Sequence, residues 1–409
     1  MRILHTSDWH LGRSFHGVGM LGAQAAHVDH LLEVVESEQV DLVLVAGDVH
    51  DRALPPVDAV ELADETFARL AASRASVVVS SGNHDSPARL GFNSRLADAS
   101  GVHLRTRWQE VGTPVLLGDD HGTVAVHAIP YLEPDAVRAA WSLPERSHQA
   151  ALGAAMARVH ADLLHRDPVR SVVLAHAFVA GSPDAAPEMA STSERDISVG
   201  GLSIAPTSLF TGVDYAALGH LHGPQTLTDT VRYSGSPLAY SFSEAGHTKG
   251  SWLVDLGPSG VTGTTFVPAP VPRGLATVRG RLADLLADPE LAVHKDHWLQ
   301  VTLTDSRRPQ HAMDQLRARF PHTLVLGFEP EGAPARRGPV VPHVDGRSDL
   351  DVALGFVAEV RELEASTEEE LLLQLACDSC RLEEDADADF RGVDLHGEVG
   401  QGRGEKAVG

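Results

Sequence analysis

Two histidines stand directly after an apolar run in the stretch YAALGHLHGP. They are His220 and His222, with one residue between them. Side chains at positions i and i+2 of extended backbone point the same way, so both imidazoles could reach one metal ion. A loop that merely contains two histidines would look the same. The pair alone leaves both interpretations open.

The same arrangement recurs at the ends of four other apolar runs. Their polar residues are Asp8, His10, Asp48, Asn83, His84, Asp85 and His176. Because the carboxyl ends of parallel strands meet at one edge of a sheet, we expect these side chains to face one crevice. This number of carboxylate, amide and imidazole groups suits a centre of two divalent metal ions bridged by a short Asp. The ligand types fit manganese, iron or zinc and do not decide between them.

The elements that must position these side chains are short apolar strands alternating with amphipathic helices. A strand is predicted before each polar group, with helices between them at 25–39, 56–73 and 135–165. Continuous runs of Val, Leu and Ala predict sheets that helices bury on both sides. The predicted fold class is therefore α/β: a layered sandwich of two mixed sheets flanked by helices. A small α+β domain and C-terminal helices follow it.

Changes in composition divide the chain. A linker rich in Pro near 268–274 closes a first domain, predicted to span 1–270. The segment 275–330 has the pattern of a small βαβαβ module, predicted to be a capping domain.

A second linker, rich in Pro, Gly and Arg, precedes two amphipathic helices that are predicted over 348–384. The second helix begins with a capping pattern, Ser366 to Glu369. Such a helical pair either packs on its own domain or receives the helices of a partner. The remaining segment, 385–409, is acidic and polar, which is typical of a disordered tail.

The bulk composition limits the kind of protein. The formal net charge is −23 over 409 residues. Proteins that hold nucleic acid by their overall field are usually basic, so the substrate is small, or cationic contacts are local, or a partner and metal ions supply them. Two cysteines, Cys377 and Cys380, fit a reducing compartment and are expected to be plain thiols on a helix. With no secretory signal or membrane-spanning run in the sequence, we expect a cytoplasmic protein.

The ordered motifs D-x-H, G-D, G-N-H-D, H and G-H-x-H resemble those of the calcineurin-like metallophosphoesterase family. The resemblance implies two ligand sets that share Asp48. The first ion would be bound by Asp8, His10, Asp48 and His222, and the second by Asp48, Asn83, His176 and His220. His84 would lie near the leaving oxygen of a phosphoester, oriented by Asp85, and would stabilise charge or donate a proton there.

Longer stretches are similar to the SbcD family, the nuclease subunits of bacterial SbcCD complexes. They include MRILHTSDWHLGRSF, AGDVHDRALPP, SGNHDSPARL and VRYSGSPLAYSF. The similarity implies Mn²⁺-dependent cleavage of DNA in repair, recombination and replication, as a double-strand exonuclease and as a hairpin and single-strand endonuclease. It also implies an SMC-like ATPase of the SbcC type as partner, bound by the C-terminal helices, and a homodimer within a heterotetramer. The alternative is a stand-alone phosphodiesterase acting on small nucleotides, which would not need a tethered pair of helices.

The chain departs from many non-bacterial relatives at one position of the site. Where they carry a second catalytic histidine, three residues after the bridging aspartate, this chain has Asp51. His50 stands one residue earlier. Neither residue is assigned a role from the sequence.

Overall fold

The computed structural model describes residues 1–166, 169–181, 204–331, 348–361 and 364–390. Side chains are described for all of these except 359–361 and 379–390. The chain forms two compact units, Met1–Gly332 and Ala333–Gly409.

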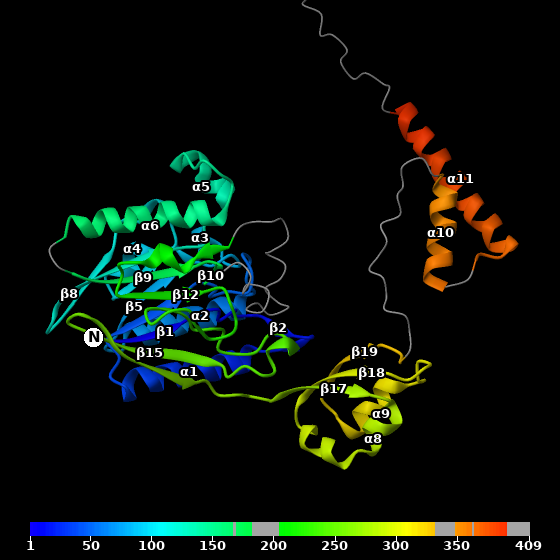
Figure 1. Cartoon of the computed structure of the whole chain (residues 1–409), viewed down its shortest axis with the longest axis horizontal. Coiled ribbons are helices and arrows are strands. Elements are labelled where there is room, and N and C mark those ends of the chain that lie inside the picture. Colours follow the sequence, from blue (N-terminus) through cyan, green and yellow to red (C-terminus); the bar gives the residue numbers. More distant parts are fainter. Residues whose placement is uncertain (167–168, 182–203, 332–347, 362–363, 391–409) are drawn as a thin grey trace, which may run out of the picture. The chain divides into compact units, whose positions relative to one another are not determined.

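The first unit contains two six-stranded mixed sheets (Figure 1). In the first sheet β1, β4, β5 and β6 run parallel to one another. At one edge β15 pairs antiparallel with β1, and β16 pairs antiparallel with β15. Its order is β16 (Gly260–Pro268), β15 (Gly250–Gly257), β1 (Arg2–Thr6), β4 (Leu42–Ala46), β5 (Ser76–Ser80) and β6 (Val102–Arg105).

The second sheet has a parallel centre with an antiparallel strand at each edge. Its order is β13 (Gln225–Thr226), β14 (Val231–Tyr233), β12 (Tyr215–Gly219), β9 (Arg170–His176), β8 (Gly122–Ile129) and β7 (Val115–Asp119). The fold confirms the layered α/β sandwich predicted from the sequence.

Helices cover the outer faces of the two sheets, as Figure 1 shows for α1 and α6. They are α1 (Leu21–Ser37), α2 (Val57–Ala71), α3 (Pro87–Leu90), α4 (Ser94–Asp98), α5 (Pro134–Trp141) and α6 (His148–Leu164). The short elements are β2 (Ser14–Phe15), β3 (Val18–Gly19), β10 (Val179–Ala180), β11 (Ala205–Pro206) and the 3₁₀ turns η1 (Trp108–Glu110), η4 (Thr207–Phe210) and η5 (Phe242–Glu244).

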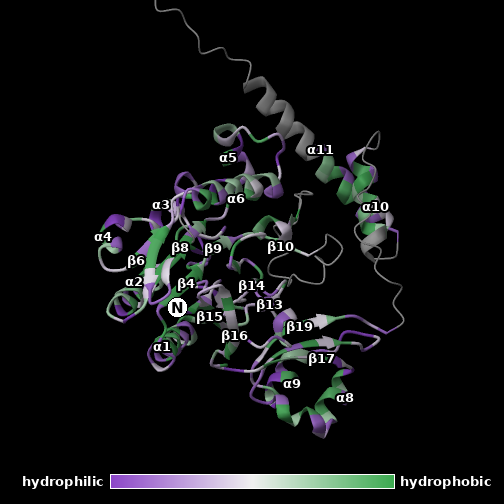
Figure 2. Ribbon diagram, turned by 60° about the vertical axis from the view of Figure 1, so that its left-hand side comes forward, coloured by the Kyte–Doolittle hydropathy of each residue, from purple (hydrophilic) through white to green (hydrophobic). Residues whose placement is uncertain are grey.

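The core has three apolar layers because successive strand side chains point to opposite faces. On β4, Leu42 and Leu44 pack between the two sheets, whereas Val43 and Val45 pack against the helices. Every residue of β4 is buried, as expected for a strand covered on both sides. In Figure 2 hydrophobic colour runs along strands such as β8, whereas the helices carry mixed hydrophobic and hydrophilic colours.

One helix expected from the sequence is two helices in the structure. The span 135–165 is interrupted between Trp141, where α5 ends, and His148, where α6 begins. Ser142 adopts a left-handed conformation with φ 54°, and Ser147 caps α6 by accepting a hydrogen bond from the backbone N–H of Ala150. Pro144 lies between them and has no N–H to continue a helix.

The segment after β16 forms a small parallel sheet of its own, with the βαβαβ order predicted for it. Its elements are β17 (Leu275–Gly280), α8 (Leu282–Ala287), η6 (Pro289–His294), β18 (Trp298–Leu303), α9 (Ala312–Arg319) and β19 (Thr323–Phe328). It meets the two-sheet body through an aromatic joint in which Phe15 stacks on Trp298, with ring centroids 5.1 Å apart. Phe242 packs on the same Phe15 ring at 5.0 Å.

The second unit holds two helices, α10 (Asp349–Arg361) and α11 (Thr367–Phe390). The predicted capping box is confirmed: the N–H of Glu369 donates to Ser366 Oγ at 3.3 Å, and the N–H of Ser366 donates to Glu369 Oε2 at 2.9 Å. Helix α11 extends six residues past the expected end at 384, and 391–409 lie outside the described residues. Cys377 is a free thiol, and the side chain of Cys380 is outside the described set. No helix in the described ranges is long and apolar enough to cross a membrane.

Candidate metal centre

The polar groups that follow β1, β4, β5, β9 and β12 lie together at the carboxyl ends of these strands. Seven members are buried: Asp85 is 5% exposed, and six are less than 5% exposed, namely Asp8, His10, Asp48, His176, His220 and His222. Asn83 and His84 are partly exposed. The strand ends therefore bring together the side chains that were predicted from the sequence to face one crevice.

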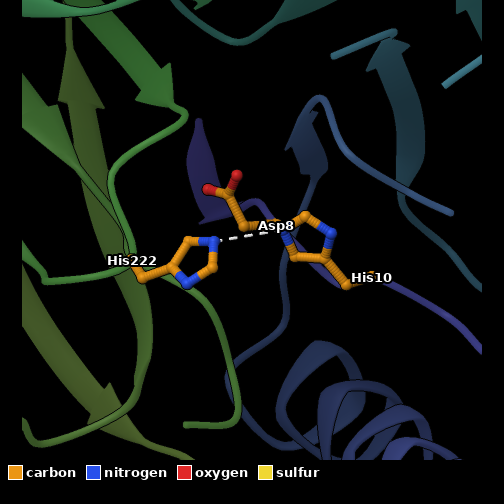
Figure 3. Close-up of side chains that lie close together, drawn as sticks. All are labelled: Asp8, His10 and His222. Atoms are coloured by element: carbon orange, nitrogen blue, oxygen red, sulfur yellow. Dashed lines mark hydrogen bonds between the residues drawn. The ribbon is translucent and has the colours of Figure 1, made fainter. Parts of the chain in front are cut away.

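Asp8, His10 and His222 form one half of the centre, the half expected to hold the first ion (Figure 3). The Nε2 atoms of the two histidines face each other at 3.1 Å. One potential ligand atom from each of the three residues lies within 4.8 Å of the others. Three donor groups aimed at one point in this way fit a cation.

The other half, expected to hold the second ion, consists of Asn83, His176 and His220. His176 Nε2 is 2.9 Å from Asn83 Oδ1, and His220 Nδ1 is 3.2 Å from the same oxygen. The Nδ1–H of His176 donates to the carbonyl of Ala46 at 2.8 Å, so neutral His176 presents a bare Nε2 lone pair to the Asn83 oxygen. Two acceptors that face each other repel unless a proton or a cation lies between them.

Asp48 lies between the halves. Its Oδ2 is 3.7 Å from His10 Nε2 and 3.4 Å from His176 Nε2. Its Oδ1 accepts the backbone N–H of His84 at 2.8 Å, which fixes the carboxylate. The carboxylate thus reaches both halves, the position that a bridging ligand needs.

The backbone at several of these residues is in an unfavourable conformation. Asp8, His10 and Asp48 have φ values of 54°, 47° and 50°, and His220 has φ 116°. Such conformations cost on the order of 1–3 kcal/mol each outside glycine and persist where the surroundings enforce them. Here the N–H of Asp8 donates to the Gly47 carbonyl at 3.0 Å, and that of His10 to the Asp48 carbonyl at 3.0 Å. Strain gathered on four nominated ligands indicates that the site is built for function.

Burial and mutual charge shift the pKa values of the cluster. Burial, with the nearby His176, lowers the pKa of His220 to about 3, so His220 is neutral and able to act as a ligand. Burial alone would lower the pKa of His176, but the Asp48 carboxylate raises it to about 9. Burial would raise the pKa of Asp48, yet His176 holds it well below its usual range. A metal ion bound here would displace the His176 proton, so affinity should fall as pH falls.

The structure places His84 beside the cluster but gives it an unexpected partner. Its ring packs edge-on against His10 with centroids 4.8 Å apart, and its Nδ1 is 2.8 Å from the carbonyl oxygen of Asp51. Asp85 was expected to orient this ring. The Asp85 carboxylate instead accepts three backbone N–H groups, those of Val49, His50 and Gly82, at 3.1, 2.9 and 2.9 Å. It thereby ties the loop after β4 to the loop after β5.

Comparison with known proteins agrees with this geometry. A family model for calcineurin-like phosphoesterases matches residues 1–224. A second model, described as the type 5 capsule protein repressor C-terminal domain, matches residues 271–373. The D subunit of the nuclease SbcCD from Staphylococcus saprophyticus subsp. saprophyticus is 30% identical over 329 residues, which is 80% of this chain and 84% of that protein. The chain belongs to the SbcD family of calcineurin-like phosphoesterases.

As a member of the SbcD family, the chain is a metal-dependent phosphoester hydrolase. The solved structures to which the chain is similar include the following two. The protein TT1561 of Thermus thermophilus has a TM-score of 0.38 and 13% identity, covering 65% of this chain and 98% of its own. A β-glucosidase from Exiguobacterium marinum has a TM-score of 0.21 and 8% identity, covering 80% and 89%. At these scores neither structure bears on the assignment.

Sequence reasoning missed two buried charges behind the first half of this SbcD centre. Glu244 Oε1 is 3.3 Å from His222 Nδ1, and Lys249 Nζ donates to Glu244 Oε2 at 2.5 Å. Burial alone would raise the pKa of Glu244, but Lys249 and His222 hold it below its usual range. Both residues lie in a polar stretch with no strand end to mark them. Two signals were available: the chain has only three lysines, of which Lys249 is one, and Glu244 stands two residues after the SbcD-like stretch VRYSGSPLAYSF.

Proposed function

We propose that this chain is the nuclease subunit of an SbcCD-type complex and hydrolyses phosphodiester bonds of DNA. The activities are exonucleolytic on double strands and endonucleolytic on hairpins and single strands, in DNA repair and recombination. The observation that carries the proposal is the pair of donor clusters that share Asp48, in a chain 30% identical to a protein named as the D subunit of the nuclease SbcCD. The proposed setting is the cytoplasm, with which two cysteines in the whole chain agree.

Two divalent ions, Mn²⁺ in this proposal, would lower the pKa of a bound water and offset charge on the phosphoryl oxygens. Asp8, His10, Asp48 and His222 would hold the first ion, and Asp48, Asn83, His176 and His220 the second. The carboxylate and imidazole donors fit Mn²⁺ without selecting it over Fe or Zn. The identity of the metal is therefore the part of the proposal that metal replacement must test.

His84 and Asp85 would have separate roles in the reaction. The Asp51 carbonyl occupies Nδ1 of His84, which leaves Nε2 to meet the leaving oxygen of the substrate. There a protonated imidazole would donate its proton or stabilise the developing charge. Asp85 would act indirectly, because its three backbone hydrogen bonds keep the loops that carry Asp48 and Asn83 in place.

The partner proposed for the C-terminal unit is an SMC-like ATPase of the SbcC type. Helices α10 and α11 expose Phe356, Leu371, Leu372 and Leu375, which are 64%, 65%, 65% and 56% exposed. Apolar residues spaced along exposed helices fit a helical partner. Such a partner would also supply the cationic contacts to DNA that a chain of net charge −23 lacks. The segment 275–330 is proposed to be a cap that helps to admit DNA.

A homodimer within a heterotetramer is the proposed assembly. A groove of about 510 Å³ runs between α2 and the α3–α4 segment. Val60, Phe92 and Leu96 line it and are 46%, 74% and 71% exposed. A second copy of the chain would cover these side chains. A Phe92→Asp variant should therefore sediment as a monomer where the unmodified chain sediments as a dimer; equal sedimentation of the two would contradict this assembly.

The decisive experiment is cleavage of an end-labelled DNA hairpin with Mn²⁺, with and without the SbcC-type ATPase and ATP. Cleavage that is lost in Asp48→Asn would support the nuclease function, and the effect of the ATPase would show whether the partner is needed. The competing function is a stand-alone phosphodiesterase for small nucleotides. DNA left intact under both conditions, while a small chromogenic phosphodiester is hydrolysed, would favour that alternative.

A further inference from the structure

His222 is fixed from behind by a buried ion pair. Glu244 is 1% exposed and Lys249 is 5% exposed. Besides its bond to Glu244, Lys249 Nζ donates to the carbonyl oxygen of His222 at 2.7 Å and to Ser236 Oγ at 3.0 Å. Burying two charges is costly, and replacing such a pair by apolar residues is often neutral for stability. Its presence next to a metal ligand therefore calls for an explanation other than stability.

The geometry supplies that explanation. A carboxylate at Nδ1 accepts the proton there, which leaves Nε2 as the lone pair and increases its basicity. In this chain Nε2 of His222 is the atom that faces His10 Nε2 at 3.1 Å. Lys249 contacts both Glu244 and the backbone carbonyl of His222, so it fixes the carboxylate relative to the residue that the carboxylate orients.

Neighbouring contacts hold the segment that carries Glu244. The backbone N–H of Tyr240 donates to Glu244 Oε2 at 3.3 Å. The hydroxyl of Tyr240 donates to the Trp9 carbonyl at 2.5 Å, one residue before His10. Phe242, two residues before Glu244, packs into the aromatic joint against Phe15. The carboxylate is thus fixed at the same place relative to both histidines of the first half.

We propose that Glu244, held by Lys249, is a positioning residue that aims His222 at the first metal ion and sets the affinity for that ion. The proposal rests on the two-ion function above. It assigns a role to two residues that lie outside the ligand motifs. Loss of an outer hydrogen-bond partner of this kind typically weakens metal binding by about 10–100-fold.

The test is calorimetric titration of Mn²⁺ into the full-length chain, without DNA. The first-ion step is identified as the one lost in His10→Gln. In Glu244→Met we expect that step to weaken by about 10–100-fold, while the second-ion step stays within about twofold. Glu244→Gln, which can still accept the Nδ1 proton but has no charge, should fall between Glu244→Met and the unmodified chain.

The double variant Glu244→Met/Lys249→Met separates positioning from stability. Glu244→Met alone leaves the buried charge of Lys249 unpaired, whereas the double variant removes both charges. The thermal midpoint of the double variant should therefore lie closer to that of the unmodified chain than the midpoint of Glu244→Met does. If Glu244 orients His222, first-ion affinity stays weak in the double variant. Recovery of that affinity together with the midpoint would overturn the proposal, because Glu244 would then serve only to neutralise Lys249.

A matched control is Asp119→Asn. It breaks the ion pair of Asp119 with Arg170, which is 6% exposed, at the end of the second sheet away from the strand ends that carry the ligands. It should lower the thermal midpoint and leave both Mn²⁺ steps unchanged; a weakened first-ion step in this control would also overturn the proposal. If the unmodified chain bound no Mn²⁺, the two-ion function itself would fail, whereas unchanged binding in every Glu244 variant would reject this inference alone.

Discussion

His222 and His176 are both buried, and each points Nε2 into the metal centre, His222 toward His10 and His176 toward Asp48. Different groups hold the Nδ1 atoms of the two rings. His222 is held by the side chain of Glu244 at 3.3 Å, and His176 by the backbone carbonyl of Ala46 at 2.8 Å. The first half of the centre is therefore oriented by side chains, and the second by the sheet itself, since Ala46 ends β4. A site oriented by side chains can be tuned by one substitution, whereas one oriented by the sheet changes only when the backbone moves.

The largest effect should come from Asp48, which both halves share. Asp48→Asn removes the negative charge that reaches His10 and His176. Metal ions contribute several kcal/mol to a phosphoryl transfer, so we expect DNA cleavage to fall by at least about 10³-fold and both Mn²⁺ steps to weaken. Cleavage assays and calorimetry measure this. Retention of one ion at full affinity would show that Asp48 belongs to one half only. The description of two halves that share Asp48 would then be wrong.

His84 should affect turnover and not metal binding. It touches Asp48 through its backbone N–H at 2.8 Å, a bond that His84→Gln retains. Because only the ring is exchanged, kcat should drop by about 10²–10⁴-fold, the usual contribution of a general acid or base, with both Mn²⁺ affinities kept. Single-turnover cleavage at saturating Mn²⁺ gives the rate, and titration gives the affinities. A loss of affinity equal to the loss of rate would instead make His84 a metal ligand beside His10, in the first half.

The side chains that gather at the centre could be predicted because each follows a buried strand. Asp8, Asp48 and Asn83 mark the ends of apolar runs, and parallel strands bring such ends to one edge. The layered fold was predictable from the same runs. The break between α5 and α6 was readable in principle from Pro144 and Ser147, but continuous helical periodicity on both sides concealed it.

The partners behind the ligands could not be predicted in this way. The carbonyl of Asp51 that meets His84 is a backbone group, which every residue has, so no residue type reveals it. Glu244 reaches His222 across 22 residues only because the chain returns past the strand end. The family resemblance implied that Asp85 orients His84, whereas its carboxylate accepts backbone N–H groups of the loop after β4.

Gly82→Ala tests the loop packing that holds Asp48, the ligand that both halves share. A Cβ atom at Gly82 would lie 2.1 Å from Asp48 Oδ1 and 2.5 Å from the Asp48 backbone nitrogen, so the loop must shift. We expect a loss of unfolding free energy of about 1–3 kcal/mol from this overpacking. Both Mn²⁺ steps should weaken, because Asp48 reaches both halves. Gly118→Ala is the control, because nothing lies within 4 Å of its added Cβ. Weakening of one Mn²⁺ step alone would show that Asp48 serves only one half.

The smallest effect at neutral pH concerns His5, a buried histidine on β1 that lies outside both ligand sets. Its Nε2–H donates to the Leu218 carbonyl at 3.0 Å and its Nδ1 lies 2.9 Å from the Tyr215 hydroxyl, so it joins β1 to β12 beneath the site. Burial lowers the pKa of His5 to about 3, from an ordinary value of 6.5. Between these values the unfolded chain takes up a proton that the folded chain does not, so stability falls as pH falls. Above pH 6.5 both states are neutral and the group contributes no pH dependence.

His5→Gln removes this titration while it keeps a donor for the carbonyl. The difference in unfolding free energy between the unmodified chain and the variant should be flat above about pH 6.5 and should change below it by up to about 1.4 kcal/mol per pH unit. Urea unfolding at a series of pH values measures it. If the unfolding free energies of the unmodified chain and the variant changed in parallel down to pH 4, His5 would take up a proton in the folded chain without opening the sheets. Strand β1, which leads to Asp8, would then be less firmly joined to β12, which leads to His220, than the hydrogen bonds of His5 indicate.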